Sequence, residues 1–260
     1  MRKLQIVRDN AARQGRVMSI WIFVAAVFAL AGFAKGVVGL GLPTISMGLL
    51  ALMMPPSEAA AILLVPSFAT NVWQMGLNTG LRPIARRLAT MMLGVCLGTW
   101  AGAGLMSEAR GGWGGVLLGV ALVAYAVTGL MSVRFSVTRR AERFFSPLIG
   151  AATGLVSAAT GVFVIPAVPY LQALGLEKEE LVRALGLSFT VSTIALAVNL
   201  GSTGALEMSL IPLTALALVT AVLGMSLGQS VRRRLRPETF RRWFFASLLG
   251  LGGYLALTAL

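Results

Sequence analysis

Ten apolar stretches, separated by short polar or arginine-rich segments, fill nearly all of the chain after Met18. Eight of them approach the roughly 20 residues that a helix needs to cross a bilayer. Their apolar residues are continuous rather than alternating, which favours helices over the strands of a membrane barrel. The stretches are Ser19–Leu40, Leu42–Met54, Ala59–Met75, Leu88–Met106, Trp113–Ser132, Phe145–Gly161, Val162–Leu174, Leu181–Leu200, Leu210–Ser230 and Phe240–Leu260. The sequence therefore predicts an all-α polytopic membrane protein.

The composition excludes several other classes of protein. Only 12% of the 260 residues are charged, against about 25% in a soluble domain. The chain has no histidine and a single cysteine, Cys96, so an internal disulfide and a Cys/His metal site are excluded. It has no phosphate-binding P-loop motif. Paired acids, or a serine with a base, are missing from the apolar stretches, so we expect no enzyme, no catalytic residue, no metal and no cofactor.

The formal net charge of +13 invites a nucleic-acid interpretation. The arginines, however, cluster in short segments between apolar stretches, which is the positive-inside pattern of membrane proteins. We therefore expect no nucleic-acid partner, and a multi-pass protein of the cell (inner) membrane in contact with the lipid bilayer.

The order of stretches, long, short, long, long, long, occurs twice along the chain, and residues repeat with it at constant offsets. The matched residues are Gly32 and Gly36 with Gly150 and Gly154, Ser67-Phe68 with Ser188-Phe189, and Gly94, Gly98 and Trp113 with Gly224, Gly228 and Trp243. Each half is predicted to hold about four full transmembrane helices and one short helix broken by glycine and proline. The predicted parts are a basic N-terminal tail (1–18), a first transmembrane repeat (19–132), a basic cytoplasmic linker (133–144) and a second transmembrane repeat (145–260).

The loops predict how the two repeats are oriented. Three segments are rich in arginine (82–87, 134–143 and 232–242), whereas Ser107–Gly112 and Gly201–Met208 are nearly free of cations. If all ten stretches cross, the basic segments are cytoplasmic and the two repeats are inverted relative to each other. The basic tail disagrees, because it would lie outside. Either translation starts at Met18, or Leu42–Met54 is re-entrant and the tail lies inside; we favour the inverted repeat.

A glycine-rich run closes the first long stretch and is the first candidate for a binding site. Gly36, Gly39 and Gly41 precede Pro43, and we expect the helix to break at Gly36. Glycine lets a ligand approach the backbone, and amides freed at a break attract anions. The alternative is close helix packing through Gly-x-x-x-Gly.

Lys35 is the only cation deep within an apolar stretch, where a charge costs several kcal/mol unless it faces a cavity or a partner. No acid lies in a plausible neighbouring span except Glu58, which is in a short loop. A buried lysine of this kind is a natural counter-charge for an anion. The alternative is that its long side chain snorkels to the membrane surface.

Further polar residues lie within the apolar stretches of both halves, and hydroxyls or amides at this depth need a helix partner or a ligand. Thr153 occupies the position of Lys35 in the second half, where Gly161 and Pro166 form the matching break. The remaining candidate binding residues are Ser67, Thr70, Asn71 and Gln74 in the first half and Ser188, Thr190, Ser192 and Thr193 in the second.

Two motifs resemble one known family. The runs 36–43 (GVVGLGLP) and 66–74 (PSFATNVWQ) look like the first repeat of the sulfite exporter TauE/SafE family, also called the toluene sulfonate uptake permease family. The runs 154–166 and 185–189 resemble its second repeat. The resemblance covers the chain after Ser19, although Leu40 and Leu42 interrupt the first glycine cluster and residues 157–160 replace glycines in the second.

The resemblance implies a secondary transporter that exports a small sulfur-containing anion, such as sulfite or an organosulfonate like sulfoacetate, from a central site between the repeats. An anion channel and an accessory membrane subunit without transport activity are the alternatives. The expected partners are the anionic substrate and the bilayer, with a homodimer left open as an assembly.

Overall fold

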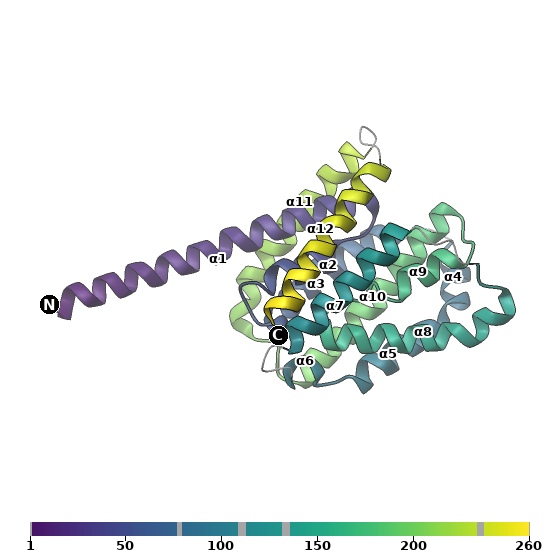
Figure 1. Cartoon of the computed structure of the whole chain (residues 1–260), viewed down its shortest axis with the longest axis horizontal. Helices are drawn as coiled ribbons and strands as arrows, with labels where there is room; N and C mark the ends of the chain where they lie inside the picture. Colours follow the sequence, from purple (N-terminus) through teal and green to yellow (C-terminus); the bar gives the residue numbers. More distant parts are fainter. Residues whose placement is uncertain (1, 77–79, 109–112, 132–135, 233–236, 260) are drawn as a thin grey trace.

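The computed structural model describes residues 2–76, 80–108, 113–131, 136–232 and 237–259, and these form helices with no strand. Helix α1 (Arg2–Val38) begins far from the other helices and projects from them in Figure 1. The C-terminal part of α1 and the remaining helices pack side by side in one bundle (Figure 1). Their bounds are α2 (Leu42–Leu50), α3 (Pro56–Met75), α4 (Leu81–Arg87), α5 (Ala89–Ala101), α6 (Leu105–Glu108), α7 (Trp113–Met131), α8 (Arg139–Thr160), α9 (Ala167–Ala173), α10 (Lys178–Ser202), η1 (Met208–Leu210), α11 (Ile211–Val231) and α12 (Pro237–Thr258).

Four helical segments among the described residues are both long and apolar enough to cross a membrane. They are Met18–Val38, Trp113–Met131, Lys178–Ser202 and Met208–Val231. Helices α3, α8 and α12 contain 20, 22 and 22 residues, which at 1.5 Å per residue also matches a hydrocarbon core of about 30 Å. The all-helical membrane fold predicted from the sequence is therefore confirmed.

Two pairs of helices run parallel along seams of glycine. In the first, α1 packs on α11: a Cβ added to Gly32 would lie 2.2 Å from the carbonyl oxygen of Ala221, and one added to Gly36 would lie 2.3 Å from that of Met225. In the second, α5 packs on α8, and a Cβ at Gly154 would lie 2.3 Å from the carbonyl oxygen of Val95. Each seam joins a helix of the first half to one of the second, with backbones close enough to exclude any side chain.

Two other pairs run antiparallel, and each joins helices at matching places in the two halves. Met75 of α3 lies against Gly186 of α10, whereas Ser67 of α3 contacts Thr193, further along α10. Gly119 of α7 lies against residues 252 and 256 of α12, and Gly129 lies against Phe245. In both pairs, residue numbers increase along one helix as they decrease along its partner, so the two helices run in opposite directions.

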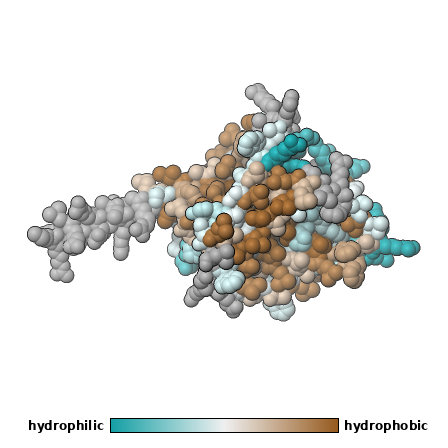
Figure 2. All heavy atoms as spheres, viewed as in Figure 1, coloured by the Kyte–Doolittle hydropathy of each residue, from teal (hydrophilic) through white to brown (hydrophobic). Residues whose placement is uncertain are grey.

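The described parts of the three arginine-rich segments lie at one end of the bundle, here called the arginine-rich end. Parallel packing brings the starts of α5 and α8 together, where Arg87 and Glu142 form an ion pair of 2.7 Å. The end of α7 precedes α8 by a few residues and meets the start of α12, which carries Arg241 and Arg242. Figure 2 shows apolar side chains over most of the face in view and hydrophilic ones gathered toward its upper and right-hand edges.

The two short helices that the sequence predicts are present, but several boundaries differ. Helix α2 has 9 residues and α9 has 7, too few to span a bilayer as straight helices. Helix α1 continues through Gly36 and ends at Val38, so the expected break at Gly36 is wrong. Close packing of Gly36 on α11 keeps it helical, and the turn falls at Gly39 and Gly41, whose φ angles are 80° and 115°.

Two further boundaries differ from the predicted stretches. The stretch 88–106 is not one helix: α5 stops at Ala101, and a turn that includes Gly104, with φ 89°, separates it from α6. Helix α8 begins at Arg139, inside the predicted linker, because the Thr138 side chain accepts a hydrogen bond from the amide of Ala141 and caps the helix.

Candidate functional site

The side chain of Lys35 is buried where α1 passes α3, and it is only 2% exposed. Its ammonium donates one hydrogen bond to Asn71 Oδ1 and another, of 3.1 Å, to Thr70 Oγ1. Among the residues that the structure describes, no acidic side chain pairs with it. The alternative that Lys35 snorkels to the surface is therefore wrong, and its positive charge is held by neutral groups.

The hydrogen bonds continue from Lys35 across to the second half of the chain. Asn71 Nδ2 donates to Ser67 Oγ at 3.1 Å and to Thr193 Oγ1 at 3.4 Å. Ser67 and Thr193 are in turn 3.2 Å apart between their hydroxyl oxygens. These five residues, Lys35, Ser67, Thr70, Asn71 and Thr193, are here called the Lys35 network. They join α1, α3 and α10, so the candidate site draws on both halves.

The turn after α1 lies beside this network, where Gln74 of α3 contacts it. Gln74, one helical turn beyond Asn71, donates from Nε2 to the carbonyl oxygen of Gly39 at 3.0 Å. Its Oε1 is buried and has no hydrogen-bond partner within the described parts of the chain. Pro43 is the second residue of α2, two residues after Gly41. The turn at Gly39 and Gly41, the side-chain amide of Gln74 and the Lys35 network therefore lie next to one another.

The candidate residues of the second half do not form a matching network. Thr153 Oγ1 and Thr190 Oγ1 each donate to a carbonyl oxygen one turn earlier in their own helix, at 2.7 Å. Ser188 and Ser192 on α10 are fully buried, and neither hydroxyl has a partner among the described residues. Pro166 directly precedes α9.

The candidate glycines lie mostly against protein rather than open space. A Cβ at Gly41 would lie 2.9 Å from the ring of Phe244, and one at Gly161 would lie 2.8 Å from the side chain of Met47. Gly36 belongs to the α1–α11 seam. Only Gly39 meets nothing closer than the Gln74 amide, 3.6 Å away. Among these four, Gly39 is thus the glycine with room beside it.

Sequence reasoning missed two polar residues in the same helices. Ser157 of α8 is fully buried, and its hydroxyl has no partner in the described part of the chain. It lies four residues after Thr153, so helical spacing was the available signal. Asn199 of α10 donates to the carbonyl oxygen of Thr99 at 3.2 Å and ties α10 to α5.

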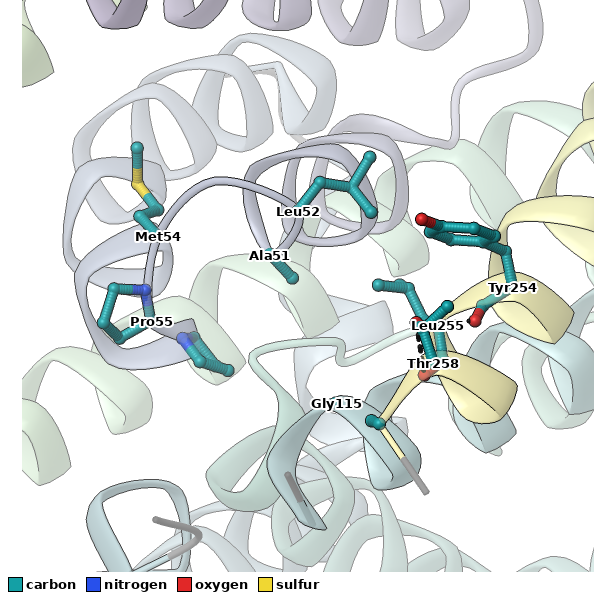
Figure 3. A pocket seen from close by; sticks show the side chains of 10 residues that line it. Ala51, Leu52, Met54, Pro55, Gly115, Tyr254, Leu255 and Thr258 are labelled. Atoms are coloured by element: carbon teal, nitrogen blue, oxygen red, sulfur yellow. Dashed lines mark hydrogen bonds between the residues drawn. The ribbon is translucent and has the colours of Figure 1, made fainter. Parts of the chain in front are cut away.

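Two surface cavities lie elsewhere, and neither is lined by the Lys35 network. The first, of about 380 Å³, lies between the segment after α2, the start of α7 and the end of α12. Figure 3 shows Leu52, Met54 and Tyr254 around it, and no charged side chain lines it. The hydroxyl of Thr258, one of the lining residues, already donates to the carbonyl oxygen of Tyr254 at 2.8 Å. The second cavity is basic and is lined by Arg87, Arg139 and Arg143.

Long apolar helices that enclose a buried polar network define an integral membrane protein. The profile of the sulfite exporter TauE/SafE family matches residues 24–255, nearly the whole chain, and the chain belongs to that family. Membership implies membrane export of sulfite or a related anion, and the family consists of transporters. No curated protein and no solved structure matches the chain.

Proposed function

We propose that the chain exports a small sulfur-containing anion, sulfite or an organosulfonate such as sulfoacetate, through a central site that includes the Lys35 network. The observation that carries this proposal is a buried ammonium with no acidic partner among the described residues. An ammonium has three N–H groups, and two of those of Lys35 are donated to neutral oxygens. A sulfonate or sulfite oxygen can accept the third and supply the missing negative charge, which offsets the cost of burying the cation.

The proposed site lies between two inverted repeats. Repeats related by an axis in the membrane plane place matching helices in opposite directions. The antiparallel pairs α3 with α10 and α7 with α12 support this arrangement, because each pairs a helix with its counterpart. The shared location of the arginine-rich segments supports a cytoplasmic arginine-rich end.

Export of an anion needs no motor in this scheme. An interior-negative potential contributes about 2.3 kcal/mol per charge per 100 mV. At roughly 150 mV this favours an external excess of a monoanion by a few hundred-fold. The driving force therefore acts on the substrate itself, and Lys35 serves to stabilise the anion at depth.

Counterflow in proteoliposomes tests the transport function. Vesicles loaded with unlabelled sulfite or sulfoacetate should accumulate the same labelled anion from outside, saturably, and acetate should compete poorly. Flux that is rapid but shows neither saturation nor counterflow would favour an anion channel. Absence of flux for every sulfur anion in a correctly folded preparation would contradict the proposal and favour an accessory subunit.

Cysteine labelling tests the orientation. In a Cys96→Ala background, single cysteines at Arg86 and Arg140 should react with an impermeant thiol reagent only from the cytoplasmic side. A cysteine at Glu207 should react from outside. Labelling of all three positions from one side would contradict the inverted repeat while leaving the transport proposal standing.

A further inference from the structure

A cavity of about 490 Å³ lies at the arginine-rich end of the α5–α8 seam. Its lining residues are Arg87, Thr90, Arg139, Glu142, Arg143 and Ser146. Three arginines and one glutamate leave the cavity with a net charge of +2. Guanidinium groups and hydroxyls are the donors that bind phosphate-like oxyanions. The lining is thus complementary to an anion.

Glu142, the single acidic residue that lines the cavity, already forms an ion pair with Arg87. Glu142 is buried and accepts two hydrogen bonds from Arg87, from Nε at 2.7 Å and from Nη2 at 2.9 Å. The hydrogen bond to Glu142 raises the pKa of Arg87 above its ordinary value, so the guanidinium stays charged. Arg139 and Arg143 form no ion pair with any residue that the structure describes. Their charges remain available to a ligand.

The matching place in the other seam shows that helix packing alone does not require these charges. The duplication relates Arg87 to Ala217, and it relates Glu142 and Arg143 to Val24 and Ala25. The further counterparts of Thr90, Arg139 and Ser146 are Thr220, Trp21 and Phe28. The α1–α11 seam therefore closes without an ionisable residue at these positions. The charges of the cavity are therefore not needed to pack the two helices, which favours a binding role for them.

Exposed apolar side chains lie on the same two helices as the cavity. On α5, Leu93 and Leu97 follow Thr90 at helical spacing and are 64% and 61% exposed. On α8, Phe144 and Leu148 are also exposed. In a membrane such a surface is covered by acyl chains. A ligand whose anionic head fits the cavity and whose tails cover these side chains is an anionic phospholipid.

We propose that the basic cavity at Arg139 and Arg143 binds the phosphate of an anionic phospholipid headgroup, with its acyl chains along α5 and α8. The lipid would bridge the first-half helix α5 and the second-half helix α8 at the arginine-rich end. The proposal is independent of the transported anion. A soluble phosphate presents the same oxyanion without tails, so the test separates the two sources.

The binding test uses the full chain in neutral detergent with fluorescently labelled phosphatidylglycerol as probe. Arg139→Gln with Arg143→Gln should weaken binding about 30-fold, since each arginine near a membrane surface contributes about 5-fold. Arg140→Gln is the matched control, because Arg140 is exposed in the same helical turn but does not line the cavity. It should leave binding nearly unchanged. An equal loss in Arg140→Gln, or no loss in the double variant, would overturn the proposal.

Thermal unfolding identifies the source of the phosphate. Phosphatidylglycerol should raise the Tm of the natural protein and of Arg140→Gln, but not that of the double variant. Phosphatidylcholine and inorganic phosphate should each leave the Tm unchanged. A rise with inorganic phosphate equal to that with phosphatidylglycerol would overturn the lipid assignment. The single variant Arg143→Gln, at an exposed position, provides the same comparison with a smaller perturbation.

Discussion

The Lys35 network and its counterpart in the second half occupy matching positions of a duplicated sequence but carry different chemistry. The offsets that relate the two halves pair Lys35 with Thr153 and Asn71 with Ser192. In the first half the charge, the amide and the hydroxyls bond to one another. In the second half Thr153 bonds within its own helix and Ser192 bonds to nothing described.

The two glycine seams, by contrast, are nearly equivalent. Gly36 in the α1–α11 seam and Gly154 in the α5–α8 seam both lie where a Cβ would approach a backbone oxygen to 2.3 Å. The duplication therefore preserves the positions at which backbones touch and changes the side chains around the centre. The helical frame is therefore symmetric, whereas the charge that would bind an anion is supplied by the first half alone.

Removal of the single charge should have the largest effect. Lys35→Ala should weaken anion binding about 100-fold, because a hydrogen bond to a charged group contributes roughly 1.5–3 kcal/mol. Lys35→Arg should retain some binding with altered selectivity, since a planar guanidinium needs different oxygen geometry. Lys35→Glu should abolish binding by repulsion. Titration of the purified protein with sulfite and sulfoacetate measures each affinity.

The matched control for Lys35 is its counterpart. Thr153→Ala removes a hydroxyl that bonds only to the carbonyl oxygen of Ile149, so it should leave affinity nearly unchanged. Unchanged affinity in a folded, membrane-inserted Lys35→Ala protein would mean that the lysine plays no part in binding.

A carboxylate placed beside the lysine should have the next largest effect. Asn71→Asp would give Lys35 an internal partner, and the substrate would then compete with a buried ion pair. We expect binding weaker by about 30-fold with the fold retained. Asn71→Ser, which copies the second-half residue, should weaken binding less. Transport rates together with Tm values separate the two variants, and tighter binding by Asn71→Asp would contradict an anionic substrate.

The seams give a prediction on stability. Gly36→Ala and Gly154→Ala should destabilise the protein by similar amounts, at least 1–3 kcal/mol, because each added methyl overpacks a backbone contact. Gly39→Ala should cost about 1–2 kcal/mol for its left-handed conformation alone, since its surroundings leave room. Chemical unfolding in detergent measures all three. A large loss for only one seam would show that the two seams are not equivalent.

Much of this fold could be predicted because hydropathy and glycine spacing are local signals. The membrane class, both short helices and the burial of Lys35 followed from them. Which glycine ends α1 could not be predicted, since Gly36 and Gly39 differ only in what packs against them. The bond between Ser67 and Thr193 links residues 126 apart and depends on how α3 and α10 pair. The ion pair between Glu142 and Arg87 could not be predicted, because an acidic residue within a basic segment is normally expected to face solvent.

Substitution of the two buried serines of the second half, Ser188 and Ser192, should have the smallest effect on anion binding. It tests whether the second half contributes to the site at all. Ser188→Ala and Ser192→Ala remove hydroxyls that bond to no described residue, so neither should lower the Tm. If these hydroxyls donate to the anion, each change should weaken binding about fivefold, as a neutral hydrogen bond of roughly 1 kcal/mol would. Thr190→Val is the control, because its hydroxyl is already used by the carbonyl oxygen of Gly186. Unchanged binding in both serine variants would restrict the anion to the Lys35 side, whereas a fall in Tm would mean that the serines hold the helices together.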